Sequence, residues 1–497
     1  MRFSAALSEK THLKAVNHLI RTDGQEDLCF GIWHPSNGKE RQSALIRDII
    51  IPAPGDRQNH GNASFNSIYF QRALAVAVAQ KGGLVFMHSH IGPGWQGMSR
   101  DDVNTELIHA AATQGATGLP LVGMTIGTDG SWSGRFWVKT MPKVYERKWC
   151  ESVRVIGKAL QITYNNDIIH LPKFRKELER TRSAWGDGKQ ADLARLKVGV
   201  VGLGSVGSIV AEAIARMGIA DITLIDFDGI ETINLDRTLH ATEFDAESHR
   251  SKVDVIAEGI RESATADKFE VHKTEFGITE EPGYRNALNC DILFSCVDRP
   301  WPRHVLNYIA YAHLIPVVDG GISVRVSKRH TIKGADWKAH TIGPGRRCLE
   351  CVGQYDTGLV SAEREGYLDD PTYIEALPYE HPIKRNENVF AFSLSTASFQ
   401  ILQFLSMIIS PLGVSDVGEA NYHFVTGRLD IKETNECNTT CLFPGLIAMG
   451  DNAEYVVTGH HQKADEARAR RQLYYKRNQM FIFRIINNLK RFIHQDK

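Results

Sequence analysis

Short apolar runs alternate with amphipathic segments through the second half of the chain. Val198–Val201 is an uninterrupted apolar run, which is typical of a buried parallel strand. Apolar residues then recur at helical period over Ile209–Met217, and Asp221–Ile225 predicts a second strand. The order strand, helix, strand is typical of an α/β fold built on a parallel sheet.

The alternation continues further along the chain. We predict a helix around 252–262 and strands around 269–274, 291–296 and 315–318, the last continued by two glycines. These segments extend the same sheet.

The first half has a comparable pattern. It predicts a helix over 8–21, strands over 28–33 and 44–51, and a helix over 69–80. An apolar strand then ends at His88, and a further helix begins near Ser99 and continues to about Ala112. The chain therefore opens with a separate α/β unit.

With 497 residues, the chain exceeds the usual size of a single core, so several domains are expected. We predict a first domain over 1–142, a mixed connector with helical tendency over 143–190, and a second domain over 191–455. A basic, helix-forming tail follows over 456–497, and we expect it to pack on its own protein or on a partner. A membrane-surface helix is the alternative, because the tail carries an apolar stripe: Phe481, Ile482, Ile485, Ile486 and Leu489.

Three glycines between the first strand and the first helix of the second domain indicate a phosphate site. Gly202, Gly204 and Gly207 have G-x-G-x-x-G spacing, which lets the backbone approach a phosphate at a helix N-terminus. Alone, this pattern is shared by several enzyme classes. The polar residues after the second strand narrow the choice: carboxylates suit ribose and magnesium, and an amide and a guanidinium suit phosphates. These residues are Asp226, Asp228, Asn234 and Arg237.

The stretch Lys197–Arg237 resembles the adenylating domain of ThiF-type proteins and ubiquitin-activating enzymes, and the resemblance continues through Lys252, Asp298 and a cysteine-containing segment. It implies a Rossmann-like domain that uses ATP with Mg²⁺ to adenylate the C-terminal glycine of a ubiquitin-like protein. By position, Lys252 would steady the triphosphate and Asp298 would bind magnesium. Arg180 matches an arginine that reaches the ATP of the opposite subunit in a homodimer; its alternative reading is one charge in a solvated run.

Four of the eight cysteines form two close pairs, Cys348-x-x-Cys351 and Cys437-x-x-x-Cys441. Two such pairs on turns are typical of a closed, tetrahedral structural zinc site. The other four are Cys29, Cys150, Cys290 and Cys296, and burial is their default interpretation. No thiol is evident that could take the activated protein as a thioester.

A second metal pattern lies in the first domain. His88 and His90 are two apart on a strand, so both imidazoles project from the same face. Ser99 and Asp102 follow at the start of the next helix. Two histidines and an aspartate with an open fourth position are typical of catalytic zinc, although S-x-x-D is also close to a helix capping box.

This pattern resembles the JAB family of zinc isopeptidases, also called JAMM or MPN, over about residues 8–140. The resemblance implies that His88, His90 and Asp102 bind zinc, that Ser99 helps to hold the oxyanion, and that a glutamate activates water. Glu26 is the best match for this general base, with Asp27 adjacent. The loop after His90 is one residue longer than the commonest form and carries Ile91 where proline is usual.

Composition excludes several other classes. Fifty-eight basic residues balance 58 acidic ones, which argues against a nucleic-acid-coating role. We see no apolar run of the length that spans a bilayer and no signal peptide. Paired cysteines suit a reducing compartment, so we expect a cytoplasmic protein.

Together the two halves predict a bifunctional enzyme that adenylates a ubiquitin-like protein and also cleaves its precursor or conjugate. Such fusions occur in bacterial operons resembling ubiquitin conjugation systems, which implies a conjugating-enzyme-like partner and a role in antiviral defence. Two alternatives stay open: adenylation for sulfur transfer in cofactor synthesis, and one domain acting only as a docking platform.

Overall fold

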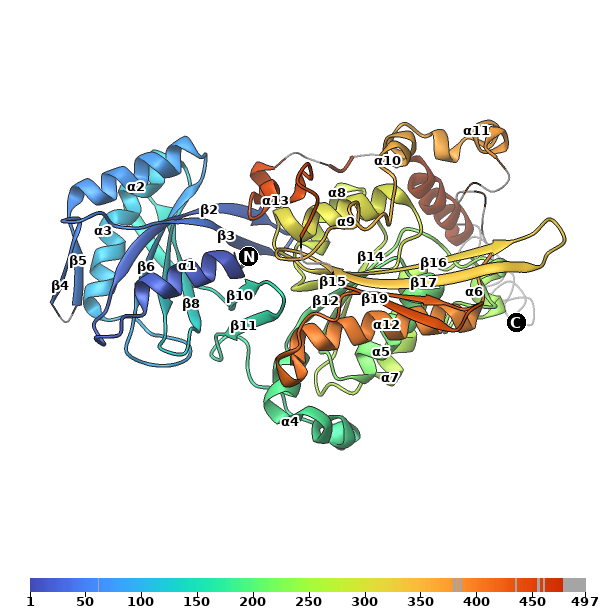
Figure 1. Cartoon of the computed structure of the whole chain (residues 1–497), viewed down its shortest axis with the longest axis horizontal. Coiled ribbons are helices and arrows are strands. Elements are labelled where there is room, and N and C mark those ends of the chain that lie inside the picture. Colours follow the sequence, from blue (N-terminus) through green and yellow to red (C-terminus); the bar gives the residue numbers. More distant parts are fainter. Residues whose placement is uncertain are drawn as a thin grey trace, which may run out of the picture.

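The structure is a computed structural model of the 497-residue chain. It describes residues 1–60, 62–378, 387–433, 436–453, 456–458 and 461–476, and the single positions 381 and 384. Two α/β units lie side by side along the longest axis (Figure 1). We call residues 1–164 the N-terminal unit and residues 176–476 the C-terminal unit.

The N-terminal unit is built on a nine-stranded mixed sheet of order β11-β10-β1-β3-β2-β6-β7-β8-β9. Its helices begin at polar caps: Ser8 accepts from the Thr11 amide, and Asn66 accepts from the Tyr69 amide. Its elements, in chain order, are β1 (Arg2–Ser8), α1 (Glu9–Leu19), β2 (Leu28–Asn37), β3 (Arg41–Ile50), β4 (Arg57–His60), β5 (Asn62–Phe65), α2 (Ser67–Ala79), β6 (Gly83–Ser89), α3 (Arg100–Thr117), β7 (Leu121–Ile126), β8 (Trp132–Met141), β9 (Val144–Trp149), β10 (Ser152–Ile156) and β11 (Leu160–Tyr164).

The predicted connector is different in the structure. Residues 143–190 were expected to have a helical tendency, but their first part forms β9, β10 and β11, and only α4 is helical as expected. β10 pairs in parallel with β1, from Ser4 opposite Ser152 to Ser8 opposite Ile156. The prediction lacks both β1 and β10, although β1 also pairs with β3 and β10 with β11; the pairing of β1 with β10 joins residues 148 positions apart in the chain. The N-terminal sheet therefore extends to residue 164.

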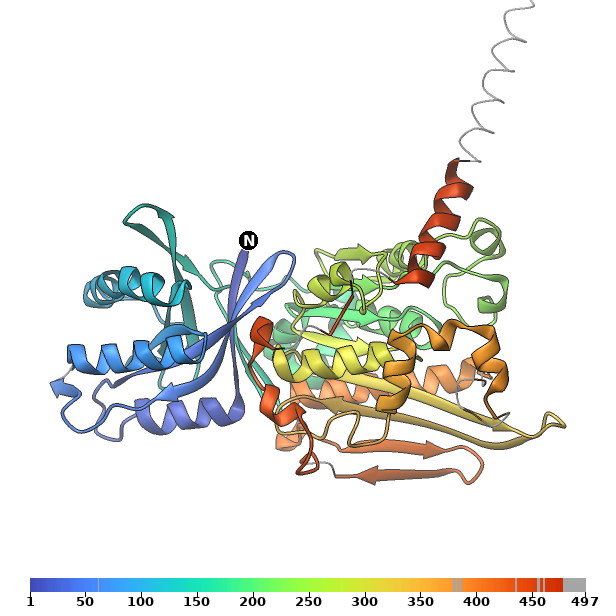
Figure 2. The ribbon, with the colours of Figure 1, turned by 90° about the horizontal axis from the view of Figure 1, so that it is seen from above.

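The C-terminal unit is built on an eight-stranded sheet of order β14-β13-β12-β15-β16-β17-β18-β19. The pairings from β14 to β16 are parallel, and β17, β18 and β19 add antiparallel strands. Figure 2 shows the β16–β17 hairpin extending beyond the helices. The elements are η1 (Lys176–Leu178), α4 (Glu179–Ala194), β12 (Lys197–Val201), α5 (Ser205–Arg216), β13 (Asp221–Ile225), η2 (Thr232–Asn234), α6 (Glu243–Glu247), α7 (Lys252–Ser263), β14 (Glu270–Thr274), α8 (Glu281–Ala287), β15 (Ile292–Ser295), α9 (Pro300–Ala312), β16 (Val317–Val326), β17 (Ile332–Ile342), α10 (Thr357–Arg364), η3 (Tyr367–Asp369), α11 (Pro371–Ala376), α12 (Phe390–Ile409), η5 (Pro411–Gly413), β18 (Glu419–His423), β19 (Arg428–Lys432), α13 (Phe443–Leu446) and η6 (Gly450–Asn452).

Helices cover both faces of this sheet, as the apolar runs predict. α5, α7 and α12 pack on one face with a core that includes Ile214, Ile256 and Phe404. α8 and α9 pack on the other face, with Tyr284 and Trp301 in the core. The α/β class is confirmed, and the predicted segments 198–201, 209–217, 221–225, 252–262 and 269–274 correspond to β12, α5, β13, α7 and β14.

α12 departs from one expectation. We expected no apolar run long enough to span a bilayer, yet α12 has 20 residues and passes that test by length and composition. Half of the tested segment is buried within the protein. On the inner face, Gln400 Nε2 donates to the carbonyls of Ser295 and Val318, both at 3.0 Å. These hydrogen bonds identify α12 as a core helix of its unit.

The predicted C-terminal tail falls partly outside the described residues. Residues 462–476 are helical, as expected, and pack on the C-terminal unit. The apolar stripe from Phe481 to Leu489 lies outside the described residues.

A buried charge network joins the two units. Asp291, just before β15, accepts from Arg41 Nη1 of β3 at 2.6 Å and lies 3.7 Å from Arg154 of β10. Lys197, the first residue of β12, bonds to Glu151 at 2.6 Å. All five side chains are at least nine-tenths buried. The core is also continuous here, since Leu45 and Ile156 belong to the same cluster as Val198.

We predict that Asp291→Asn lowers the free energy of unfolding by about 3 kcal/mol, because it leaves buried cations without their carboxylate. Chemical denaturation followed by tryptophan fluorescence measures the loss. Asp187→Asn is the control, since Asp187 forms an exposed pair with Arg182 and its loss should leave the denaturation midpoint unchanged. Equal midpoints for Asp291→Asn and wild type would contradict a structural role for the network.

A candidate nucleotide site and two candidate metal centres

The glycine-rich turn joins β12 to α5 with little room for side chains. Gly202 has φ +85°, and a Cβ there would lie 2.7 Å from the Cys296 carbonyl oxygen. A Cβ at Gly207 would lie 1.8 Å from the Gly202 carbonyl oxygen. Gly204, the N-cap of α5, has open space within 4 Å. The first and third glycines are required by packing, and the second leaves the helix N-terminus accessible to an anion.

Asp226 links the end of β13 to this turn. Its carboxylate accepts from the Leu203 amide at 2.6 Å and from the Asp228 amide at 2.7 Å. Burial raises the pKa of Asp226 above its ordinary value, although Lys252 and the two amides oppose this shift. The side chain thus fixes the turn 226–228 relative to the glycines.

Lys252 interacts with three carboxylates that follow two different strands, β13 and β15. Its Nζ is 3.0 Å from Asp228 Oδ2. Burial alone would lower the pKa of Lys252, but the charges of Asp226, Asp228 and Asp298 more than offset it and raise that pKa. Asp298 follows β15 and Asp226 follows β13, so the parallel strands bring the predicted residues together at one edge of the sheet.

The side chains of Asn234 and Arg237 form hydrogen bonds with residues close to them in the chain. Asn234 Oδ1 accepts from the Glu231 amide at 3.1 Å, which caps η2. Arg237 Nη1 donates to the Ile233 carbonyl at 2.7 Å and also bonds to Asp236. Among the described residues, no recorded hydrogen bond joins either side chain to Asp226, Asp228 or Lys252, so the structure does not assemble the complete predicted set.

Arg180 lies on α4, which projects from the body of the C-terminal unit (Figure 1). The side chain is exposed and forms no ion pair with any described residue. Its neighbour Arg182, by contrast, is paired with Asp187. Within one chain, Arg180 is therefore free of the structural contacts that hold Arg182.

The four paired cysteines converge as predicted. Their sulfur atoms all lie within 4.8 Å of one another, and Cys348 Sγ is 3.7 Å from Cys441 Sγ. A tetrahedral site with Zn–S bonds of about 2.3 Å requires sulfur atoms about 3.8 Å apart. Donation from the Cys348 thiol lowers the pKa of Cys437 to about 5, and backbone amides donate to Cys348, Cys351 and Cys437 at 3.3–3.4 Å. The donor set fits a structural zinc ion.

The histidine motif also converges. His88 Nε2 lies 3.1 Å from His90 Nε2, and Asp102 lies 3.4 Å from the first and 3.3 Å from the second. Burial would raise the pKa of Asp102, but the imidazoles and the Ser99 amide more than offset it and lower that pKa. Two imidazole nitrogens and a carboxylate that converge on one point are a donor set that fits a divalent cation such as zinc.

Ser99 and Asp102 also form a capping box at the start of α3. Ser99 Oγ accepts from the Asp102 amide at 3.1 Å, and Asp102 Oδ2 accepts from the Ser99 amide at 2.7 Å. The role of Ser99 and Asp102 in the helix cap is therefore compatible with a role of Asp102 as a metal ligand. The cap orients the carboxylate that faces the histidines.

Glu26 and Asp27 differ in their surroundings. Asp27 is buried, and its carboxylate pairs with Arg57 at 2.8 Å and with Arg21 at 3.4 Å. Leu28 pairs with His88 in the antiparallel β2–β6 ladder, so the same register continued by two residues brings Glu26 opposite His90. Glu26 is only partly buried. This arrangement favours Glu26 over Asp27 as the acid on the histidine face.

A buried polar network lies beneath His88, and no sequence motif indicates it. Thr125 Oγ1 lies 3.4 Å from His88 Nε2 and accepts from Arg135 Nη1 at 2.6 Å. Arg135 in turn donates to Glu106 at 3.0 Å, and Trp137 Nε1 donates to Glu106 at 2.6 Å. These partners come from α3, β7 and β8, so no local spacing relates them.

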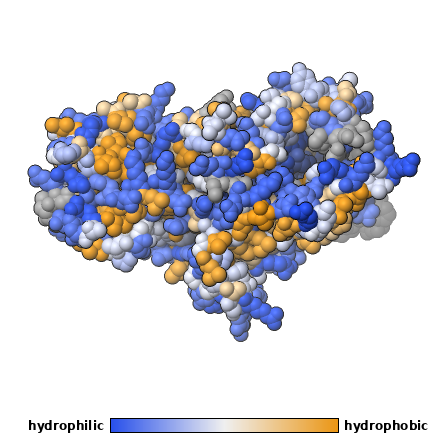
Figure 3. Space-filling model, viewed as in Figure 1, coloured by the Kyte–Doolittle hydropathy of each residue, from blue (hydrophilic) through white to orange (hydrophobic). Residues whose placement is uncertain are grey.

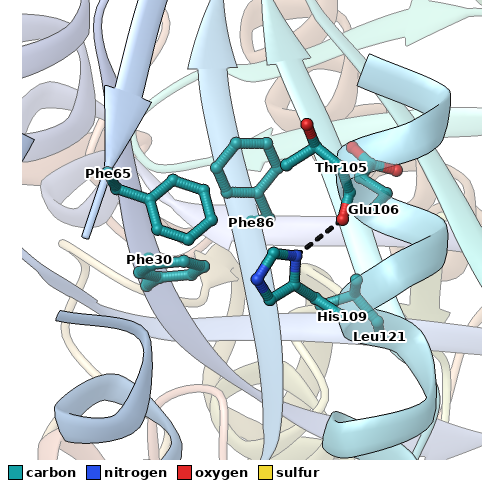
Figure 4. A pocket seen from close by; sticks show the side chains of 7 residues that line it. All are labelled: Phe30, Phe65, Phe86, Thr105, Glu106, His109 and Leu121. Carbon is teal, nitrogen blue, oxygen red and sulfur yellow. Dashed lines mark hydrogen bonds between the residues drawn. The ribbon is translucent and has the colours of Figure 1, made fainter. Parts of the chain in front are cut away.

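Aromatic packing completes the floor of this site. Figure 4 shows a hollow between α3 and the sheet, where His109 Nδ1 bonds to the Thr105 carbonyl at 2.7 Å. The hollow is too small for a water molecule, and Phe86, one of its lining residues, stacks on His88 with ring centroids 5.4 Å apart. We interpret it as core packing that holds the His88 ring.

Asn388 lies near the glycine turn, although no sequence motif predicts it there. Asn388 Nδ2 donates to Ser205 Oγ at 2.8 Å, at the first residue of α5. It lies just before α12, 183 residues away in the chain. Only the packing of α12 on α5 brings this amide to the turn.

The remaining cysteines match the predicted burial. Cys29, Cys150 and Cys290 are fully buried, and burial raises the pKa of Cys290 to about 12. Cys296 is partly buried, and burial also raises the pKa of its thiol. All four thiols are therefore poor nucleophiles in this fold.

Known proteins are similar to this chain over part of its length. Ubiquitin-like modifier-activating enzyme 5 of Drosophila willistoni is 28% identical over 145 residues, which are 27% of this chain and 34% of that protein. Molybdopterin-synthase adenylyltransferase of Escherichia coli (strain K12) is 29% identical over 171 residues, which are 34% of this chain and 62% of that protein. The chain thus spans less than two thirds of the length of either relative.

Among solved structures, the crystal structure of E. coli MccB is similar over 60% of this chain and 77% of that one, with 17% identity and a TM-score of 0.42. The ThiF family matches residues 178–435, just over half of the chain, and this range contains the glycine turn, Lys252 and Asp298. The chain belongs to the ThiF family.

Proposed function

We propose that the C-terminal unit uses ATP to adenylate the C-terminal glycine of a ubiquitin-like protein. The observation that carries the proposal is the meeting of an accessible helix N-terminus with Lys252 and three carboxylates at one edge of the sheet. The names of the curated relatives, an activating enzyme and an adenylyltransferase, agree with this chemistry.

Each residue then has a defined task. The amides after Gly204 bind phosphate, and Asp226 and Asp228 provide acceptors for ribose hydroxyls and metal-bound water. Lys252 exchanges its bond to Asp228 for a phosphate oxygen when the nucleotide binds. Asp298 would hold magnesium, which neutralises phosphate charge during the transfer. Asn234 and Arg237 would have to leave their local partners to reach the phosphates.

We expect Asp298→Ala to reduce ATP–pyrophosphate exchange at least about a hundredfold, because a residue that clamps the charge of the transition state is lost. The assay uses small candidate proteins that end in glycine. Zinc content and cleavage by the N-terminal unit should remain at wild-type levels. Undiminished exchange in the variant would exclude Asp298 from the site.

The N-terminal unit is proposed to be a zinc isopeptidase of the JAB type that acts on the same ubiquitin-like protein. His88, His90 and Asp102 would hold the ion, and their convergence supports this role. Zinc would supply a Lewis acid that polarises the scissile carbonyl and lowers the pKa of water. Glu26 would take the proton from the attacking water, and the Ser99 hydroxyl would donate to the oxyanion.

Glu26→Gln should retain zinc but lose cleavage of a ubiquitin-like protein extended beyond its glycine, whereas His88→Ala should lose both. Elemental analysis is expected to give about two zinc ions per chain for wild type and Glu26→Gln, and about one for His88→Ala. Cys348→Ser should lose the other ion. If Glu26→Gln cleaves normally and Asp27→Asn does not, Asp27 is the base.

The protein is further proposed to act as a homodimer through the C-terminal unit. The outer face of α12 carries exposed Leu394 and Leu402, and Figure 3 shows apolar surface over this helix. α4 packs beside α12, since Lys189 donates to the Ile408 carbonyl at 3.4 Å. A second copy that covers α12 would receive Arg180 from the projecting α4, where its guanidinium would stabilise phosphate charge.

Mixing Arg180→Ala chains with Asp298→Ala chains should restore about a quarter of wild-type exchange, because half of the randomly formed dimers have one intact site. Arg182→Ala is the matched control on the same helix, and this variant should be active by itself, without mixing with a second variant. An inactive mixture that contains mixed dimers would rule out action in trans. A sedimenting monomer with full activity would rule out the dimer.

The fate of the adenylate follows from the cysteines. All four cysteines outside the zinc cluster have a raised thiol pKa, and three are fully buried, so the acyl group is proposed to pass to an external thiol. A conjugating-enzyme-like partner is our first proposal, in a cytoplasmic pathway that serves antiviral defence. Transfer to a sulfur donor is the second, and the name of the molybdopterin-related relative favours it. The neighbouring reading frames discriminate between them.

A further inference from the structure

Residues 456–458 and 461–476, which we call the C-terminal segment, lie beyond the residues that match the ThiF family, yet they pack along the proposed nucleotide edge of the sheet. The C-terminal segment contacts the residues that follow three parallel strands of this sheet: Phe227 after β13, Glu275 after β14, and Trp301 at the start of α9, after β15. In Figure 2 its helix, drawn in red, stands against the green elements of the C-terminal unit. Carboxyl-end loops at these positions bind ligands in open α/β sheets.

Arg471 makes a buried contact with the turn after β13. The residue is 3% exposed, and its Nη1 donates to the Phe227 carbonyl at 2.9 Å. Its Nη2 pairs with Glu275, after β14, at 3.1 Å. Phe227 lies between Asp226 and Asp228, so Arg471 fixes the backbone that carries both carboxylates.

Ring contacts connect the same turn to the end of β15. His461 lies with its centroid 5.3 Å from that of Phe227, and it stacks on Trp301 at 5.9 Å. Trp301 follows Asp298 by three residues, and its Nε1 donates to the Val456 carbonyl at 3.2 Å. One segment thus holds the loops that carry Asp226, Asp228 and Asp298.

Two further bonds fix the segment itself. Arg468 pairs with Glu280, which is 2% exposed, at 2.7 Å. The Thr458 amide donates to the Thr279 carbonyl at 2.9 Å. The helix is therefore anchored on the loop after β14 and does not rest on Arg471 alone.

We propose that the C-terminal segment is an integral wall of the nucleotide site and that Arg471 is a positioning residue for binding of ATP with its divalent cation. The proposal rests on the proposed nucleotide binding. Arg471 acts through the Phe227 carbonyl: with that carbonyl held, the 226–228 turn presents its carboxylates in the orientation that Lys252 also uses. Without it, the turn has to be ordered when the nucleotide binds, which weakens binding.

The test compares Arg471→Met with Arg470→Met, whose side chain is exposed on the same helix. Isothermal titration of the full-length protein with ATP and magnesium at 25 °C should give a Kd raised about tenfold for Arg471→Met and unchanged for Arg470→Met. Arg471→Lys retains a charged donor and should recover most of the affinity. Thermal denaturation without nucleotide is measured in parallel.

The outcomes separate the two proposals. Absence of ATP binding in wild type would overturn the proposed function itself. If wild type and Arg471→Met bind ATP with the same Kd, the proposed role of Arg471 is overturned and the proposed function is not. The same conclusion holds if Arg471→Met lowers the melting temperature but leaves the Kd unchanged. If Arg471→Met does not fold, His461→Ala provides the measurement: a Kd raised about threefold supports the wall, and an unchanged Kd overturns it.

Discussion

Asp291 of the C-terminal unit pairs with two buried arginines of the N-terminal sheet, and this ion cluster determines how the chain is assembled. A carboxylate without a partner in such an environment is strongly disfavoured, so Arg41 and Arg154 of the N-terminal unit have to pack against the start of β15. Lys197 and Glu151 repeat the arrangement at the start of β12. The amino ends of the central parallel strands are thus fixed by the first unit, and their carboxyl ends remain available for ligands.

That polarity explains where the chemistry lies. In a parallel sheet all carboxyl ends meet at one edge, and there the glycine turn, Asp226 and Asp298 converge on Lys252. The C-terminal segment closes the same edge from outside the family match. The N-terminal unit uses a different device: a strand that ends in two histidines and a capped helix whose first turn supplies a carboxylate. Both sites place charged groups on rigid elements, and each site is supported by buried partners distant in sequence.

The continuous core and the ion cluster also bear on the proposed pairing of activities. Because the two units share buried contacts, they form one body in which the proposed adenylation site and the proposed cleavage site keep a fixed relation. An extended, glycine-ended tail would therefore meet two sites in a constant geometry. The proposed external acceptor for the acyl group agrees with the raised thiol pKa of the four cysteines outside the zinc-type cluster.

The sequence by itself determined the elements whose signals are local. The glycine spacing, the H-x-H pair with S-x-x-D, and the two cysteine pairs predicted sites whose atoms the structure brings together, because the residues within each short motif share one strand end, cap or turn. Tertiary structure decided everything that depends on long-range pairing. β1 and β10 become part of the sheet through their pairing with each other and with β3 and β11, so the prediction of a connector with helical tendency is wrong for residues 144–164. Thr125, Asn388 and Arg471 reach their sites from distant elements, and Asn234 and Arg237 found local partners that their spacing did not reveal. Spacing along the chain determines which side chains project from the same face of one helix or strand. Contacts between distant elements depend on how these elements pack, and only the folded chain determines that packing.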